Sequence, residues 1–152
     1  MTPLLKKLNF KGHRQICVLD NPEEFGGEMK KMETFTSVVT SPGKCNEIDF
    51  AIVFVKSKAA VDKAFKSIED KIQGDAILWF AYPKGTSKKY TADISRDKGW
   101  DTLGNAGFEV VRAVAIDDDW SAMRFRKAQF IDKMTRDSRF ALSKEGKAKT
   151  RK

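Results

Sequence analysis

Side chains that could bind an anion follow two of the apolar runs of this sequence. Lys56 and Ser57 come directly after one run, and the segment 84–88 after another holds two lysines and two hydroxyls. Ligands of open α/β sheets bind beyond the carboxyl ends of the strands, and the free N–H groups of a helix start attract anions. The sequence therefore predicts a site for a small anionic or nucleotide ligand at such an edge. The residues expected there are Asn21, Lys56, Ser57, Lys84, Thr86, Ser87, Lys88, Asp117 and Trp120.

A simpler interpretation of the same residues stays open. Residues 83–95 are a polar loop in either case, and in this interpretation Ser57 only caps a helix. Trp120 would line the ligand site as an aromatic wall or would pack over the edge of the sheet.

Metal and nucleophilic chemistry have few candidate residues. His13 is the only histidine, so any histidine-based triad would depend on it. One histidine and two separated cysteines cannot readily supply four zinc ligands. The run 117–119 holds three aspartates, which suit Mg²⁺ but are also typical of a hairpin turn. We expect no metal and no cofactor, and the sequence assigns no catalytic residue.

A methyl-donor or dinucleotide site requires a glycine-rich turn after the first strand and an acid at the end of the second. Here the first strand leads into Asp20, Asn21 and Pro22, followed by two glutamates and Phe25. The second strand leads into Thr40 and Ser41, with no acid. We therefore expect no classical methyltransferase activity, although a divergent methyltransferase-like enzyme remains an alternative.

The hydrophobic pattern predicts an α/β domain. Strands are expected at 15–20, 34–40, 50–55, 76–82, 108–116 and 120–127. The runs 50–55 and 76–82 are continuously apolar, which is typical of strands buried on both faces. Between them, Ser57 should cap a helix that extends to Gln73, with Gly74 as its stop. In 120–127 apolar and basic residues alternate, which predicts an antiparallel return after the turn at 117–119.

Three shorter helices complete the expected fold. Pro22 would open the first with Asn21 as its cap, and Ser95 would cap the second, which carries Trp100 and Leu103. The third is expected within 128–142. The predicted fold class is a three-layer, Rossmann-like mixed sheet that ends in an antiparallel hairpin, with 50–55 and 76–82 at its centre.

Charge separates the ends of the chain from its middle. The net charge is +8 over 152 residues, but 15–143 holds equal numbers of basic and acidic residues. The excess lies in a basic N-terminal segment, 1–14, and in a basic tail, 143–152, that we expect to be disordered. These ends flank one expected domain at 15–142. Non-enzymatic binding of nucleic acid or an acidic partner through these ends is the alternative function, and it would be weak and salt-sensitive.

The expected location is the cytoplasm. No apolar run is long enough to span a membrane, and no secretory signal begins the chain. Cys17 and Cys45 form no CxxC pair and no disulfide framework, which is typical of a reducing compartment. The pattern does not determine an oligomeric state.

Two resemblances extend this interpretation. The segments EIDFAIVFV, GDAILWFAYP and GFEVVRAVAIDDDWSAMRFRK, with the helix between the first two, resemble the second half of class I methyltransferase-like Rossmann folds over 47–127. That resemblance implies a fold and no activity.

The second resemblance is to a small bacterial family whose domain has no established activity. It rests on YPK and TSK at 82–88, on Arg96 and Gly99-Trp100, and on VAIDDDWSA ending in RFR at 114–126. Common descent over 75–127 is implied, and function stays open.

Overall fold

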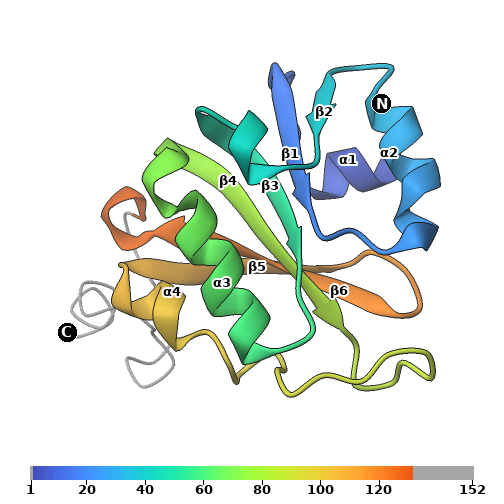
Figure 1. The fold of residues 1–152 in the computed structure, drawn as a ribbon, viewed down its shortest axis with the longest axis vertical. Coiled ribbons are helices and arrows are strands. Elements are labelled where there is room, and N and C mark those ends of the chain that lie inside the picture. Colours follow the sequence, from blue (N-terminus) through green and yellow to red (C-terminus); the bar gives the residue numbers. More distant parts are fainter. Residues whose placement is uncertain (1, 132–152) are drawn as a thin grey trace.

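A six-stranded mixed sheet forms the centre of the protein (Figure 1). The computed structural model describes residues 2–131. The strand order is β2-β1-β3-β4-β6-β5, in which β1 to β4 are parallel and β6 runs antiparallel to both β4 and β5. The strands are β1 (Gln15–Leu19), β2 (Ser37–Val39), β3 (Ile48–Phe54), β4 (Ile72–Pro83), β5 (Phe108–Ala115) and β6 (Trp120–Lys127).

Helices cover both faces of this sheet, which confirms the predicted three-layer α/β class. They are α1 (Pro3–Lys7), α2 (Gly26–Met32), α3 (Lys58–Ile68) and α4 (Asp101–Asn105). Short 3₁₀ turns lie at η1 (Glu23–Phe25), η2 (Pro42–Lys44), η3 (Glu69–Lys71) and η4 (Ala128–Phe130). In Figure 1, α3 and α4 lie in front of the sheet.

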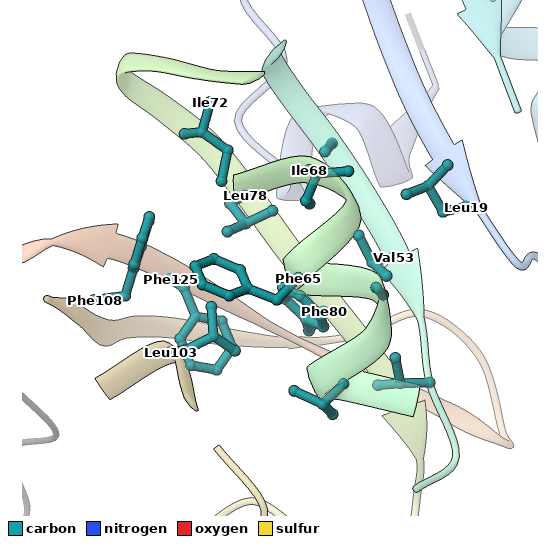
Figure 2. Close-up of a cluster of buried hydrophobic side chains, with 14 of the residues drawn as sticks. Leu19, Val53, Phe65, Ile68, Ile72, Leu78, Phe80, Leu103, Phe108 and Phe125 are labelled. Carbon is teal, nitrogen blue, oxygen red and sulfur yellow. The ribbon is translucent and has the colours of Figure 1, made fainter. Parts of the chain in front are cut away.

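The core on the α3 face is built from the apolar stripe that the sequence predicted. Val61, Phe65 and Ile68 of α3 are buried against the sheet, because a spacing of three and four places them on one side of the helix. Figure 2 shows this packing, with Phe65 beside Phe80 and with Phe108 of β5 close by. The Phe65 and Phe108 rings meet edge to face, with centroids 5.6 Å apart.

The core on the opposite face includes the N-terminal segment. Leu5, Leu8 and Phe10 are buried there with the apolar side of α2. The indole Nε1 of the fully buried Trp79 donates to the Leu8 carbonyl at 2.9 Å, so the end of α1 is attached to the middle of β4. The segment that the sequence marked as basic therefore also supplies core residues.

Several predicted boundaries were wrong. The helix after Ser57 ends at Ile68 instead of Gln73, because Ile72 pairs with Ile48 and starts β4. Gly74, expected as the helix stop, lies inside β4 with a φ of +51°. The second strand covers only Ser37–Val39 of the expected 34–40.

The predicted caps of the short helices were also wrong. Pro22 precedes the 3₁₀ turn η1, and the Asn21 side chain donates to the Pro22 carbonyl instead of capping a helix. Ser95 pairs with Lys98 in a tight turn, and Trp100 occupies the N-cap of α4. Of the helix expected within 128–142, only η4 lies in the described part, and the basic tail 143–152 lies outside it.

The connection from β2 to β3 is short for a parallel crossover. Such connections usually need a dozen or more residues and a helix, whereas here residues 40–47 with the single turn η2 return the chain to the start of β3. Cys45 in this crossover lies against Cys17 of β1, with the two sulfurs 2.6 Å apart and both thiols buried. The Lys71 ammonium donates to the Pro42 carbonyl and holds the turn from the other side.

In the described part of the chain, no helix is long and apolar enough to cross a membrane.

Candidate functional site

The carboxyl ends of five strands meet at one edge of the sheet. β1 to β4 are parallel, and β5 runs in the same direction because β6 is antiparallel to both β4 and β5. The predicted site residues all follow these strands, so the structure brings their backbone segments to a common edge. Their side chains, however, have different surroundings.

The start of α3 already has hydrogen-bond acceptors. Ser57 Oγ accepts from the Ala60 N–H at 3.0 Å, and the Asp93 carboxylate accepts from the Lys58 N–H at 2.8 Å. The Asp93 carboxylate thus already occupies the position at the start of α3 where an external anion would bind. Ser57 is a helix cap here, as the simpler interpretation expected.

Lys56 belongs to a cluster around Tyr90. The Tyr90 hydroxyl donates to the Glu24 carboxylate, whose two oxygens lie 2.5 and 2.6 Å from it. Lys89 forms an ion pair with the same carboxylate at 3.0 Å. The hydrogen bond from Tyr90 and, to a smaller extent, the one from Lys89 lower the pKa of the Glu24 carboxyl. The same contacts raise the pKa values of Tyr90 and Lys89. Lys56 Nζ lies 5.5 Å from the centroid of the Tyr90 ring. This cluster fastens the β4–α4 loop to the segment after β1.

Trp120 lies beneath that cluster. Its ring centroid is 5.0 Å from that of Tyr90 and 5.1 Å from that of Phe54, and the side chain is 2% exposed. Its indole Nε1 is buried without an acceptor in the described part of the chain. The structure thus places Trp120 in packing contact under the loop.

The aspartates of 117–119 shape the hairpin turn. Asp117 Oδ1 accepts from the N–H groups of Asp119 and Trp120, both at 2.8 Å. Asp119 turns toward the β4–α4 loop, where it accepts from Ser87 Oγ at 2.8 Å, and its carbonyl accepts from the Lys84 N–H. Among residues 2–131, no three His, Cys, Asp or Glu side chains are grouped to hold a metal ion.

A cavity of about 540 Å³ opens under the β4–α4 loop. Its cations are Lys84 and Arg96, and none of the described residues that line it carries a carboxylate. Its remaining wall is formed by hydroxyl-bearing and small or apolar residues, namely Tyr82, Pro83, Gly85, Thr86, Ser87, Tyr90, Thr91, Ala92, Ile94, Ser95 and Ser121. Volumes of roughly 300–1,000 Å³ are usual for small-molecule sites.

Buried anchors hold Arg96 at this cavity. Ser95 and Lys98 exchange backbone hydrogen bonds of 3.0 and 3.3 Å, which places Arg96 in the tight turn between them. Trp100 is buried against Phe80, Tyr82 and Phe125, and its Nε1 donates to the Ser95 carbonyl at 2.7 Å. Gly99 has a φ of +105°, and a Cβ there would meet Ile94 Cγ2 at 2.3 Å, so the turn requires glycine.

A second, smaller cavity of about 350 Å³ lies between α3 and the ends of β1 and β2. Asp20 and Lys63 are its charged residues. Asp20 has a φ of +56° and follows β1 directly, where a nucleotide-binding fold would carry its glycine-rich turn. The rest of the wall is Leu19, Thr40, Pro42, Ala60, Ala64 and Ser67.

The structure thus divides the predicted residues. Lys84, Thr86 and Ser87 line the larger cavity. Lys88 is exposed in the same loop and does not line it, and Asn21, Lys56, Ser57, Asp117 and Trp120 have the contacts given above.

Sequence reasoning missed Arg96, Ser95 and Ser121 as cavity residues. Arg96 was marked only by the resemblance to the bacterial family. For Ser121 the signal was the alternation of β6, which places it on the face opposite Trp120 and Ala122.

His13, the one histidine, lies apart from this edge. Its ring packs on Phe10 and Phe50, and its Nδ1 accepts from the Lys11 N–H at 3.3 Å.

Comparison with known proteins defines the fold. No family model matches this sequence, and no curated protein matches it. Among solved structures, the N-methyltransferase NodS from Bradyrhizobium japonicum aligns with 82% of this chain and 92% of its own, at 12% identity and a TM-score of 0.52. A protein described as a candidate type 11 methyltransferase from Sulfolobus solfataricus aligns with 82% of this chain and 90% of its own, at 10% identity and a TM-score of 0.55.

The tRNA methyltransferase TrmK from B. subtilis aligns with 94% of this chain and 74% of its own, at 9% identity and a TM-score of 0.51. At these identities the likeness shows the fold alone. The chain has a Rossmann-like α/β fold similar to the fold of these methyltransferases, as its second half suggested.

Proposed function

We propose that this protein binds a small anionic ligand in the cavity under the β4–α4 loop. The observation that carries the proposal is the charge of the lining: Lys84 and Arg96 are present, and the described lining residues include no carboxylate. Two carboxylates that do not line the cavity bond to residues of its wall: Asp119 accepts from Ser87 Oγ, and Glu24 accepts from the Tyr90 hydroxyl.

The chemistry of the wall favours a phosphate ester or a nucleotide. A guanidinium can donate two parallel hydrogen bonds to a phosphate group, and a lysine adds a second positive charge. Thr86, Thr91 and Ser95, which carry hydroxyls, line the same cavity, and Tyr82 and Ile94 add apolar groups that suit an uncharged part of the ligand. The runs that carry the resemblance to the bacterial family, at 82–88 and 96–100, form or support this cavity, so we propose the same site for that family.

A thermal-shift panel tests the proposal. It uses inorganic phosphate, pyrophosphate, nucleoside phosphates and the uncharged nucleosides as controls. A ligand at about 100 times its Kd stabilises a one-site protein by about 2.7 kcal/mol, which is a measurable shift. We expect at least one phosphate compound to raise the midpoint and its nucleoside not to do so.

Three variants locate the effect. Arg96→Ala and Lys84→Ala should weaken the stabilisation at least tenfold in ligand concentration, because each removes a cation of the cavity. Lys88→Ala removes an exposed cation of the same loop that does not line the cavity, and it should leave the shift unchanged. A panel without any shift, or an equal loss in Lys88→Ala, would refute the site.

Methyltransferase-like chemistry is the second candidate, and the fold likeness favours it. The segment after β1 has Pro22 and the 3₁₀ turn η1 in place of a glycine-rich turn, and β2 ends without an acid. Calorimetric titration with S-adenosylmethionine decides between the candidates. We expect no binding, and a micromolar Kd would replace the first proposal with this one.

A further inference from the structure

Cys17 and Cys45 are in direct contact although 28 positions separate them in the chain. Cys17 lies in the middle of β1, and Cys45 lies in the crossover that joins β2 to β3. Both side chains are fully buried in the core on the α3 face. The two thiols therefore contact each other and are shielded from solvent.

This pair lies at an unusually short connection of the fold. Residues 40–47 cross β1 with one 3₁₀ turn and no α-helix, whereas parallel connections usually have a dozen or more residues and a helix. Cys45 packs in the core, its thiol donates to the Ser41 carbonyl and contacts Cys17, and the Lys71 ammonium donates to the Pro42 carbonyl. A covalent bond at the last contact would fix the crossover to the sheet.

We propose that under oxidising conditions, and contrary to the expectation from the sequence, Cys17 and Cys45 form a disulfide that attaches the β2–β3 crossover to β1. The bond would also fix one wall of the smaller cavity, because Thr40 and Pro42 of the crossover line it. This inference is independent of the anionic ligand proposed for the larger cavity.

The reaction is a thiol–disulfide exchange with a small disulfide such as oxidised glutathione. The Cys45 thiolate attacks the glutathione disulfide, forms a mixed disulfide and releases one glutathione thiolate. Cys17, on losing its proton, displaces the second glutathione. The two protein thiols are oxidised by two electrons and lose two protons, while one glutathione disulfide is reduced to two thiols.

Burial determines when this can happen. Burial raises the pKa of the Cys17 thiol, and the contact with Cys45 raises it further, so Cys17 in the folded protein is rarely a thiolate. The exchange therefore takes place while the chain folds or opens, and oxidation of the folded protein should be slow.

The test refolds the full chain from denaturant in a glutathione redox buffer and, in parallel, in excess reductant. After alkylation under denaturing conditions, intact mass and peptide mapping count the free thiols. We expect the oxidised product to be a monomer that lacks two hydrogen atoms, takes up no alkylating group and contains a Cys17–Cys45 peptide. Its unfolding midpoint should exceed that of the reduced protein.

Cys17→Ser and Cys45→Ser are the matched controls, and each should unfold at the same midpoint in both buffers. The measurement on the natural chain stands even if a variant fails to fold. Two alkylated cysteines after oxidative refolding, bonds only between chains, or an oxidised monomer with a lower midpoint would each overturn the proposal.

Discussion

The two cavities at the carboxyl edge of the sheet are built by opposite means. The larger one lies under a long loop that is anchored at Trp100, Gly99 and the Tyr90 cluster, so an irregular segment is held by buried contacts. The smaller one lies beside a connection of only eight residues, 40–47, that has a single 3₁₀ turn and no α-helix. Their linings differ too, since two cations face the first cavity, whereas Asp20 and Lys63 face the second.

The proposed ligand site therefore does not lie where open α/β sheets usually carry one. In open α/β sheets the site lies where the strand order reverses, which here is between β1 and β3. That position carries Asp20 with Pro22 and has no glycine-rich turn for a phosphate. The positive, hydroxyl-rich surface lies instead beyond β4 and β6, on the other half of the edge.

Gly99→Ala should have the largest effect, because it removes the turn that positions Arg96. A Cβ at φ +105° would also meet Ile94 Cγ2 at 2.3 Å, so we expect a loss of about 2–4 kcal/mol in the free energy of unfolding. Urea unfolding measures it. Gly85→Ala, in the same loop with no atom within 4 Å of the new Cβ, is the control and should change the value by less than about 0.5 kcal/mol. Equal effects in both variants would show that Gly99 does not anchor the loop.

Ser57→Ala should cost about 1 kcal/mol of unfolding free energy, because the Ala60 N–H loses its cap. The Asp93 carboxylate still serves the Lys58 N–H, so α3 should remain folded by circular dichroism. Ser67→Ala is the matched control on the same helix, since Ser67 Oγ only donates to the Ala64 carbonyl. If Ser57→Ala left stability unchanged, Ser57 would be free for a ligand and the start of α3 would return as a candidate site.

Asp75→Asn should have the smallest effect, with a characteristic pH dependence. Arg126 donates to both Asp75 oxygens, at 2.8 and 2.6 Å, and lowers the pKa of that carboxyl below its ordinary value. Because the pKa of Asp75 is lower in the folded than in the unfolded protein, the ion pair stabilises the fold fully when the pH is above the unfolded-state pKa of about 3.9. This stabilisation is lost as the pH falls through the folded-state pKa. Both side chains are about one-third exposed, so the difference at pH 7 should be below about 1 kcal/mol.

Urea titrations of the natural chain and Asp75→Asn between pH 7 and pH 2 measure this difference. It should shrink below pH 4. A constant difference across that range would mean that packing, and not the ion pair, is lost in the variant.

The sequence predicted most of the fold because its strongest signals are local. The apolar runs 50–55 and 76–82 and the stripe of α3 appear where they were expected, and the acidic turn returns β6 antiparallel to β5. Boundaries failed where a tertiary contact overrode the local signal. Ile72 continued the helical spacing of α3, yet its pairing with Ile48 made it a strand residue.

The candidate site was less predictable for the same reason. Strand ends could be located from the sequence, so the edge was found, but the orientation of each side chain depends on partners far along the chain. The carboxylates of Asp93 and Glu24 lie at the start of α3 and at Tyr90, and neither partner was visible from spacing. Arg96 reaches the cavity only because Trp100 and Gly99 fold its turn back on the sheet.

The most direct test of the central claim maps binding onto the backbone by heteronuclear NMR. Inorganic phosphate and the nucleoside phosphate that most stabilises the protein are titrated into the ¹⁵N-labelled full chain. The structure predicts saturable shifts at the amides of 84–96 and Ser121, and the same spectra of Arg96→Ala should show weaker binding. Shifts confined to 19–20, 40–42 and 60–67 would place the ligand in the smaller cavity, and either that result or the absence of saturable shifts would contradict the claim.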